Sequence, residues 1–283
     1  MTEIRPFDRS AAGLEEIASL LRSRFPGAGH LSPAYLGWDY DHNPAGAAIG
    51  YNAYADGQLV AHFASRPMRA RIGNRDELGL LTQHAATRAD YAGKGLFTQL
   101  VERTMETGAD AGFGFAVAVA NANTTHPFVN KLDFQYVRPL EVKIGIAPAP
   151  RSRADDDLQF ATTWDERSIA WRLARPDRPY RATSRGDRCV VFAPSEMLGI
   201  FVEVAEFPRE LVPDSIPELS TRNPLRAWVG LDPSRDWSRT AYLEVPVKLR
   251  PAPLNLTFRD LTGRGRTLDG DRVRIQAVDF DAF

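Results

Sequence analysis

The sequence predicts an α+β fold with a central mixed, mostly antiparallel sheet, followed by a second, smaller α/β half. Segments of strand character follow one another through residue 88 and are joined by short turns, as in an antiparallel meander. A strand, a glycine turn, a helix and another strand come next, which is a βαβ unit. Residues 148–157 are rich in proline and aspartate and lack apolar periodicity. They predict a linker between a first domain at 1–147 and a second at 158–283.

The composition is that of an ordinary soluble globular protein. Of the 283 residues, 43% are hydrophobic and 25% are charged, and the formal net charge is −1. There is no basic excess for nucleic acid binding, no apolar signal segment and no run of membrane-spanning length. The one cysteine, Cys189, excludes an internal disulfide and a cysteine zinc cluster, and it is expected to be a small buried hydrophobe. We expect a reduced, cytoplasmic protein with no metal and no nucleic acid or membrane partner.

Capping residues and turns define the first elements. Ser10 can cap a helix that runs through Arg24, and Ser32 with Pro33 opens a second helix that runs through about Tyr40. The dipeptide Asp56-Gly57 is typical of a hairpin turn. Strands are expected at 2–7, 48–55, 58–72 and 77–88.

The rest of the chain is organised around residues 82–100, which begin as a strand, pass through Ala92-Gly-Lys-Gly95 and continue as a helix. Leu96 and Leu100 have the spacing of a buried helix face. The two glycines let the backbone turn sharply, and they place no Cβ in the way of a ligand. The first free N–H groups of the helix then point out of the turn at the positive end of the helix dipole. This arrangement predicts a site for a phosphate or pyrophosphate.

Two strands and a short helix follow this loop. Residues 112–121 are an apolar run typical of a buried strand. Asn121 can cap a short helix that ends in Lys131-Leu-Asp-Phe134, and residues 134–146 are expected to form one strand. This order of elements resembles the GNAT family (Gcn5-related N-acetyltransferases).

The resemblance also rests on short motifs. The family's acyl-CoA loop reads Gln/Arg-x-x-Gly-x-Gly/Ala, and the segment Asp90-Tyr-Ala-Gly-Lys-Gly95 matches it at both glycines but not at Asp90. Many members carry arginine where Ala92 stands. Asn121-Ala-Asn123 and residues 131–134 resemble a later motif of the family, with Asp133 where glycine is usual. The resemblance covers roughly the first half of the chain with good specificity, and the second half only faintly.

The resemblance implies an α/β/α-layered fold that binds acetyl-CoA or another acyl-CoA as cosubstrate. The pyrophosphate would lie on the amides of the loop, and the pantetheine arm would add alongside the diverging ends of the two strands that flank it. Arg88 and Lys94 could hold phosphate or could be solvated surface charges. The expected cofactor-binding residues are Ala86, Thr87, Tyr91, Ala92, Gly93, Lys94, Gly95, Leu96 and Asn121.

The resemblance also suggests where the acceptor would bind. In the family, the two N-terminal helices and the loop between them form one wall of the acceptor pocket. His30, Tyr35 and Tyr40 are therefore candidate substrate-binding residues, whereas Trp38 is expected to pack the helix. His62 lies in an alternating strand and is expected to be a core histidine with satisfied hydrogen bonds.

Transfer of an acyl group from a thioester to an amine needs a base, donors at the carbonyl oxygen and often an acid. The tyrosine that serves as this acid in many members is Val129 here. His84 is the candidate base, because neutral imidazole works near physiological pH, but it could equally be structural. His126 is a further candidate. Some two-half relatives, such as the enhanced-intracellular-survival acetyltransferases, place the C-terminal carboxylate in the active site, which would make Phe283 catalytic; ordinary packing explains an aromatic last residue equally well.

The second half resembles the first only in outline. Trp171-Arg-Leu-Ala-Arg-Pro echoes the segment that begins at Trp38, which suggests a degenerate GNAT-like half. No comparable Gly-x-Gly helix start follows it, and residues 263–265 are expected to be a solvated turn, so we expect a single acyl-CoA site in the first half. A helix is expected at 164–175, with strands at 188–193, 198–207, 245–249, 254–258 and 272–278. The side chains that could bind a nucleotide's base and phosphates, or form an ordinary exposed face, are Trp171, Arg172, Arg178 and Tyr180.

The leading hypothesis is an acyl-CoA-dependent N-acyltransferase that moves an acetyl or other short acyl group to a primary amine of a small molecule. A nucleotide-linked amino sugar is favoured as acceptor, because two-half members with this loop resemble enzymes of surface-sugar pathways. One alternative is a non-catalytic CoA-binding protein, which the missing tyrosine, Ala92 and Asp133 would favour. Another is a different thioester chemistry, such as decarboxylation. A homodimer is left open.

Overall fold

The computed structural model describes residues 2–146, 148–153, 157–177, 179–195, 199–221, 223–250 and 254–280. The chain folds into two compact units, and each is built from several segments of the chain. Unit 1 comprises the residues up to Arg69, then Glu77–Tyr136 and Thr257–Thr267. Unit 2 comprises Ala70–Asp76, Val137–Leu256 and the residues from Leu268 onward. This division departs from the single linker expected at 148–157, because a late segment of the chain returns to unit 1.

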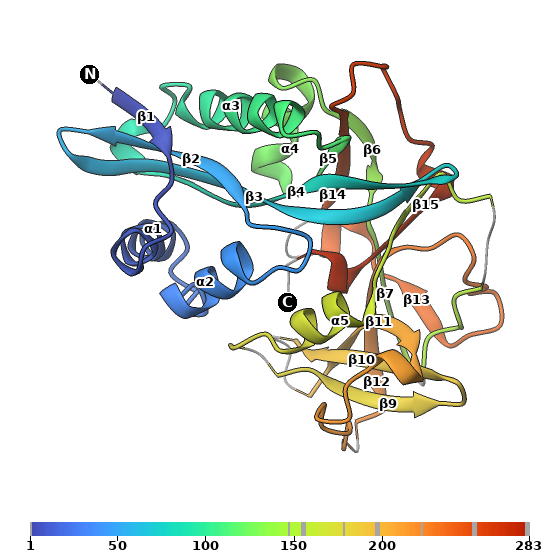
Figure 1. The fold of residues 1–283 in the computed structure, drawn as a ribbon. Coiled ribbons are helices and arrows are strands. Elements are labelled where there is room, and N and C mark those ends of the chain that lie inside the picture. Colours follow the sequence, from blue (N-terminus) through green and yellow to red (C-terminus); the bar gives the residue numbers. More distant parts are fainter. Residues whose placement is uncertain are drawn as a thin grey trace. The chain divides into compact units, whose positions relative to one another are not determined.

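Unit 1 is a sheet covered by helices on both faces (Figure 1). Its strands follow the order β1–β2–β3–β4–β5–β14–β6. Helices α1 and α2 cover one face and α3 and α4 the other, so the predicted α+β, layered fold is confirmed. The strands are β1 (Thr2–Pro6), β2 (Ile49–Ala55), β3 (Gln58–Ile72), β4 (Arg75–Thr87), β5 (Phe115–Ala120), β6 (Gln135–Pro139) and β14 (Asn255–Asp260). The helices are α1 (Ala11–Arg24), α2 (Pro33–Asp41), α3 (Leu96–Asp110) and α4 (Ala122–Lys131).

Local sequence signals produce the first elements as predicted. The side chains of Ser10 and Ser32 accept backbone hydrogen bonds at the starts of α1 and α2, and Pro33 occupies the first turn of α2. Asp56 and Gly57 have φ values of 50° and 77°, the left-handed pair that a tight hairpin between β2 and β3 requires.

The core of unit 1 lies between the sheet and α3. Leu100, Val101 and Met105 of α3 are at most 1% exposed and belong to a cluster that includes Leu80 of β4. Gly79 allows β4 and β5 to approach here, because a Cβ at this position would lie 2.3 Å from the ring of Phe115. The centre of the sheet is therefore packed closely against the helix that follows the glycine loop.

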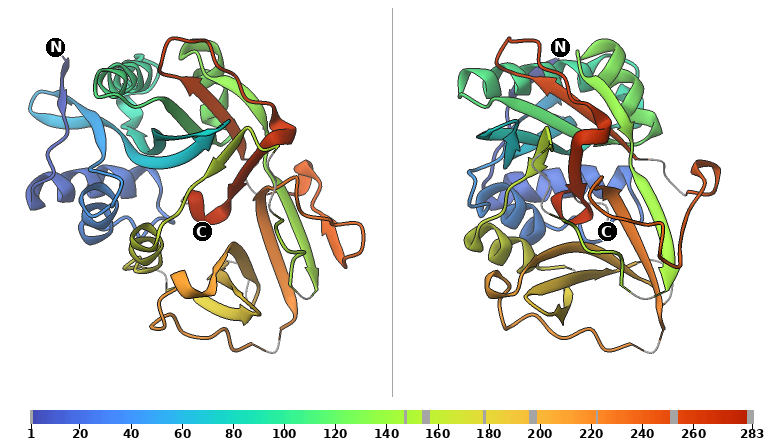
Figure 2. Two further views of the ribbon diagram at one scale, coloured as in Figure 1. Left: turned by 45° about the vertical axis from the view of Figure 1, so that its right-hand side comes forward. Right: turned by 90° about the vertical axis from the view of Figure 1, so that its right-hand side faces the viewer.

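A segment from near the end of the chain completes unit 1. Strand β14 lies between β5 and β6, where Figure 2 shows it in red beside the green strands. Arg259 makes two hydrogen bonds of 2.9 Å to Glu102 of α3, and Arg266 binds Glu77 at 2.8 Å. The expected single strand at 134–146 is in fact two strands that separate at Leu140. Strand β6 pairs with β14, whereas the following β7 (Glu141–Ile146) pairs with β12 (Leu225–Leu231) of unit 2.

Unit 2 is a mixed sheet in the order β8–β15–β12–β11–β10–β9, with β7 also paired to β12 and β13 to β7. The expected strand at 245–249 is wrong: β13 ends at Glu244, and Val247–Leu249 form a 3-10 turn after Pro246. Cys189 is 3% exposed, and burial raises the pKa of its thiol, as expected of a small core residue. The elements are β7 (Glu141–Ile146), β8 (Phe160–Thr162), α5 (Glu166–Leu173), β9 (Arg181–Arg185), β10 (Arg188–Pro194), β11 (Phe201–Pro208), β12 (Leu225–Leu231), β13 (Tyr242–Glu244) and β15 (Val273–Gln276).

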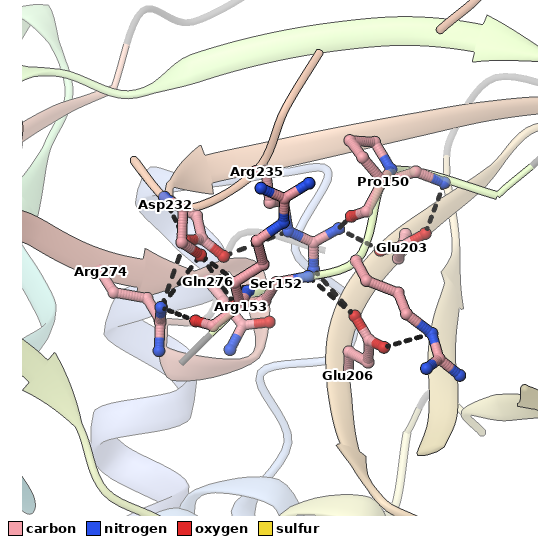
Figure 3. Close-up of polar contacts among 12 residues, drawn as sticks. Pro150, Ser152, Arg153, Glu203, Glu206, Asp232, Arg235, Arg274 and Gln276 are labelled. Atoms are coloured by element: carbon pink, nitrogen blue, oxygen red, sulfur yellow. Dashed lines mark hydrogen bonds and ion pairs between the residues drawn. The ribbon is translucent and has the colours of Figure 1, made fainter. Parts of the chain in front are cut away.

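A buried charge network holds unit 2 together around Arg235, whose side chain is fully buried (Figure 3). Its guanidinium lies 2.7 Å from Glu203 and 3.2 Å from Asp232, and a third carboxylate, Glu206, lies 3.8 Å away. Buried charges are costly unless they are paired, so these groups depend on one another. The backbone N–H of Ala149 donates to Glu203. Part of the expected linker is therefore fixed to this unit.

We predict that Gly79→Ala destabilises the protein by about 1–3 kcal/mol, because the added methyl group would overlap the ring of Phe115. Gly29→Ala is the matched control, since nothing lies within 4 Å of a Cβ there, and its effect should stay within about 0.5 kcal/mol. Urea unfolding of the two variants measures both effects. Equal stability of Gly79→Ala and the unmodified protein would contradict the close packing of β4 on β5.

Candidate functional site

The glycine loop of unit 1 has the backbone conformation that the sequence predicts. Gly93 and Gly95 have φ values of 76° and 75°, in the left-handed region that favours glycine. No atom lies within 4 Å of a Cβ built on Gly93. This glycine is therefore required by its backbone angle, and the space beside it is open.

Helix α3 starts differently from the other α-helices of the described residues. The side chains of Ser10, Ser32, Asn121 and Asp165 accept backbone hydrogen bonds at the starts of α1, α2, α4 and α5. Helix α3 begins after the left-handed Gly95, and no side chain caps it. The first N–H groups of a helix have no partner within the helix, so those of α3 are available to an anion. The amide of Ala92, which was expected to join them, instead donates to the carbonyl of Ala89.

Strands β4 and β5 diverge on the approach to this loop. Their parallel ladder joins Gly79–Leu81 to Phe115–Val117 and ends there, although β4 continues to Thr87 and β5 to Ala120. Ala86 and Thr87 lie on the diverging part of β4. An extended group with amides could pair with strand backbone in such a place, as a neighbouring strand does.

The charged residues around the loop have partners of their own. Arg88 makes hydrogen bonds of 3.1 and 2.9 Å to Asp90 and one of 2.7 Å to Gln58, and the bonds from Arg88 lower the pKa of Asp90. The ammonium of Lys94 lies 4.2 Å from the centre of the Tyr91 ring. Lys94 thus remains beside the loop, whereas the guanidinium of Arg88 is used within the protein.

The later motif of the first half also has a clear structural basis. The side-chain oxygen of Asn121 accepts from the backbone of Asn123 and Thr124 and so caps α4, as expected. Asp133 has a φ of 53°, which explains why glycine is usual at this position and why aspartate, one of the residues that tolerate this region, can replace it. His126 is exposed on α4.

Tyr40 bridges two of the histidines singled out in the sequence. The hydroxyl of Tyr40 lies 2.9 Å from Nε2 of His62 and 3.0 Å from Nδ1 of His84. Burial lowers the pKa of His62 to about 3, and burial raises the pKa of Tyr40, so both stay neutral near pH 7. His62 is 1% exposed, which confirms it as a core histidine.

Two of the three candidate acceptor residues pack against His84. The rings of Tyr35 and Tyr40 lie 5.7 and 5.6 Å from the His84 ring, and His30 packs edge-on against Tyr35 at 5.7 Å. Tyr35 and Tyr40 are fully buried, so they contact His84 as part of the core. Trp38 is 6% exposed and packs on Tyr35, as expected.

Sequence reasoning missed a buried ion pair at this site. Asp39 is fully buried, binds Arg66 at 2.8 Å and places its second oxygen 3.9 Å from Nδ1 of His84. The available signal was the charge on Asp39 between two aromatic residues of a buried helix. An unpaired buried carboxylate is costly, so the sequence already required a cation or donor beside it.

In unit 2, two residues expected to contact a nucleotide are buried instead. Arg172 is 1% exposed and donates to the carbonyls of Val278 at 2.9 Å and Phe280 at 3.1 Å. Tyr180 is 4% exposed. Burial raises the pKa of Asp279, which accepts from the indole of Trp164, to about 6. Arg178 and the candidate catalytic Phe283 lie outside the described residues.

The described residues contain neither a cluster suited to a metal nor a helix suited to a membrane. In the ranges that the structure describes, no three His, Cys, Asp or Glu side chains are grouped so that they could hold a metal. No helix in the same ranges combines the length and the apolar character needed to cross a membrane.

Comparison with known proteins finds similarity at the level of structure. No family model matches the chain, and no curated protein matches it. It is similar to an Enterococcus faecalis protein described as a probable N-acyltransferase, with 10% identity and a TM-score of 0.63 over 93% of this chain and 73% of that one. It is also similar to a GCN5-related N-acetyltransferase from Anabaena variabilis, with 9% identity and a TM-score of 0.63 over 92% of this chain and 73% of that one. For Eis1 from Mycobacterium abscessus the identity is 12% and the TM-score is 0.60, over 93% of this chain and 74% of that one. The chain therefore has the GNAT fold that the motifs indicated.

We predict that the buried, neutral His62 makes the protein less stable as the pH falls from about 6.5 towards 3. The unfolded chain gains a proton on this histidine below about pH 6.5, and the folded protein does not until about pH 3. The decrease in the free energy of unfolding that this residue causes approaches about 1.4 kcal/mol per pH unit. Urea unfolding between pH 7 and 4.5 should show a shallower decline for His62→Gln than for the unmodified protein. The exposed His126→Gln is the control, and parallel declines in all three would contradict the assignment.

Proposed function

We propose that the protein is an acyl-CoA-dependent N-acyltransferase that moves an acetyl or other short acyl group to a primary amine of a small molecule. The observation that carries this proposal is the uncapped start of α3 directly after two left-handed glycines. This helix start lies beside strands that part after a ladder of three residue pairs. The fold shared with N-acetyltransferases supports the same function.

The pyrophosphate of CoA would accept hydrogen bonds from the amides between Gly93 and the first turn of α3, with Lys94 adding positive charge. Gly93 and Gly95 place no side chain in its way. The pantetheine amides would pair with β4 near Ala86 and Thr87. Asn121 could contribute through its amide nitrogen, since its oxygen already caps α4. The thioester would then lie on the stretch of β4 that contains His84.

The transfer itself needs few groups from the protein. His84 would take a proton from the ammonium group of the acceptor, and the free amine would attack the thioester carbonyl. A C–N bond forms, the C–S bond breaks and the attacking nitrogen releases its second proton to water, so CoA leaves as a thiolate that can recover a proton from the imidazolium. Asp39, 3.9 Å from His84, would stabilise the imidazolium in the meantime.

The acceptor is less well defined than the cofactor site. A nucleotide-linked amino sugar remains a candidate, but the burial of Arg172 and Tyr180 removes two of the contacts expected for it. A panel of amines should therefore include such sugars together with aminoglycosides and amino acids, with release of the CoA thiol as the signal. Binding of CoA without turnover on any amine would favour the non-catalytic alternative, and release of CO2 from malonyl-CoA would favour decarboxylation.

We predict that acetyl-CoA stabilises the protein and that Gly93→Trp abolishes the effect. A ligand at 100 times its Kd stabilises the folded state by about 2.7 kcal/mol, which thermal unfolding detects easily. Gly263→Trp is a matched control, because Gly263 of unit 1 also has a positive φ of 72° and open space beside it. In the control variant, acetyl-CoA should still raise the temperature of thermal unfolding. No shift in the unmodified protein with any acyl-CoA would contradict cofactor binding.

We predict that His84→Gln lowers kcat about 10²–10⁴-fold and leaves the KM for acetyl-CoA nearly unchanged, since a general base contributes to the chemical step. Deletion of Phe283 provides the comparison, because it removes the other candidate catalytic group. Steady-state kinetics of both variants, with circular dichroism to confirm folding, separate the two. If the deletion abolishes turnover and His84→Gln retains it, the base is the chain terminus and His84 is structural.

A further inference from the structure

A continuous series of hydrogen bonds runs from His84 through the core of unit 1 to a carboxylate on α1. The residues are His84, Tyr40, His62, Asn52, Tyr54 and Glu16, and each is bonded to the next. Asn52 and Tyr40 are fully buried, and Tyr54 is 7% exposed. Buried polar groups are stable only when their hydrogen bonds are made, so the direction of each bond is determined by the donors and acceptors available.

The direction is set at the Glu16 end. An ionised carboxylate only accepts, so the hydroxyl of Tyr54 donates its one hydrogen to Glu16 across 2.9 Å. The Tyr54 oxygen must then accept from its other neighbour, which is the amide nitrogen of Asn52 at 3.1 Å. Asn52 therefore presents its carbonyl oxygen to His62.

The bonds of His62 continue in the same direction. Nδ1 of His62 lies 2.7 Å from the Asn52 oxygen, so it carries a hydrogen and donates. A neutral imidazole has only one N–H, and the burial of His62 keeps it neutral. Its Nε2 therefore accepts the hydroxyl hydrogen of Tyr40 across 2.9 Å.

Tyr40 has then used its only hydrogen. Its oxygen can do no more than accept from Nδ1 of His84 at 3.0 Å, so this nitrogen carries a hydrogen. In the neutral ring of His84, the lone pair is then on Nε2. The tautomer of His84 thus follows from a carboxylate five hydrogen bonds away.

We propose that Tyr40, His62, Asn52 and Tyr54 are positioning residues that hold His84 with its hydrogen on Nδ1 and its proton-accepting lone pair on Nε2. The tautomer of the neutral His84 ring follows from the hydrogen bonds and from the burial of His62, and only the use of the lone pair in acyl transfer rests on the proposed function. The series of hydrogen bonds does not conduct protons from end to end, because the amide of Asn52 is too weak an acid and too weak a base to pass a proton on. Its role is to fix orientation and protonation.

Asp39 acts on the same nitrogen from another direction. Its oxygen at 3.9 Å from Nδ1 is too distant for a hydrogen bond but close enough to favour a hydrogen, or a positive charge, on that side of the ring. Arg66 offsets part of this effect, because it binds the other oxygen of Asp39 at 2.8 Å. Tyr40 therefore supplies the directional bond and Asp39 a general electrostatic preference.

The test is a measurement of the His84 ring nitrogens by NMR in protein labelled with 15N-histidine, assigned with His84→Gln. At pH 7.5 we expect Nδ1 to resonate as a protonated nitrogen and Nε2 as an unprotonated one. Tyr40→Phe removes only the bridging hydroxyl, and it should shift the equilibrium of the His84 ring towards the Nε2–H form. Tyr51→Phe is the matched control, because its hydroxyl bonds to Thr107 and lies outside the series. The control should leave the His84 signals unchanged.

A hydrogen on Nε2 in the unmodified protein overturns the proposal, whether or not the protein is active. Unchanged His84 signals in Tyr40→Phe would also overturn the proposal, since Asp39 alone would then be sufficient to hold the hydrogen on Nδ1 of His84. On the proposed function, Tyr40→Phe also lowers kcat by about tenfold or more at an unchanged KM for acetyl-CoA. An Nδ1–H tautomer together with full activity of His84→Gln would leave the positioning intact and remove His84 as the base. The two failures are therefore distinguishable.

Discussion

The shortness of the ladder between β4 and β5 is the constraint on which the rest of unit 1 depends. The two strands are hydrogen-bonded over three residue pairs, where Gly79 lets them approach beside the Phe115 ring. Beyond this point the two strands separate. The backbone of β4 after Leu81 is therefore not hydrogen-bonded to β5, and it leads into the glycine loop. His84 lies on the part of β4 beyond this ladder, where its ring packs on Tyr35 and Tyr40. A longer ladder would have produced an ordinary parallel sheet with no opening.

The hydrogen bonds behind His84 share one direction, and this has an electrostatic effect. Each donor from His84 to Glu16 points the same way, so the bond dipoles add, and chains of this kind polarise one another. Their positive ends face the carboxylate of Glu16 and their negative ends face His84. The series therefore favours a positive charge on His84, in the same sense as Asp39. The neutral side chains of Tyr40, His62, Asn52 and Tyr54 thus favour a positive charge on the His84 ring, and Asp39 is joined by no second buried carboxylate in this series.

Local signals in the sequence predicted much of unit 1. The caps at Ser10, Ser32 and Asn121 and the left-handed glycines at 93 and 95 depend on residues within a few positions of one another, and all are present. Interactions between distant residues could not be predicted in this way. His84 meets Tyr40 across 44 positions, and no spacing rule connects them.

The second half was harder to predict because its polar residues are inside. Arginines are seldom buried, so Arg172 was expected either at a nucleotide site or on an exposed face, and no local signal indicated the burial of Arg235. In the structure, Arg172 binds backbone carbonyls and Arg235 binds three carboxylates. The break at Leu140 was missed for a related reason: residues 134–146 have continuous strand character, and only the partners of β6 and β7 reveal that they are two elements.

Strand β14 has a consequence for how the protein is made. The first 136 residues leave the ribosome long before residues 257–267, which unit 1 also requires. Until then β5 and β6 lack the strand that lies between them, and each presents an open edge. Unit 1 of the nascent chain must therefore wait, partly formed, for more than a hundred residues of synthesis. Glu77 and Glu102 remain without Arg266 and Arg259 for the same interval. A shortened transcript would yield a protein with every residue of the glycine loop and an incomplete sheet beneath it.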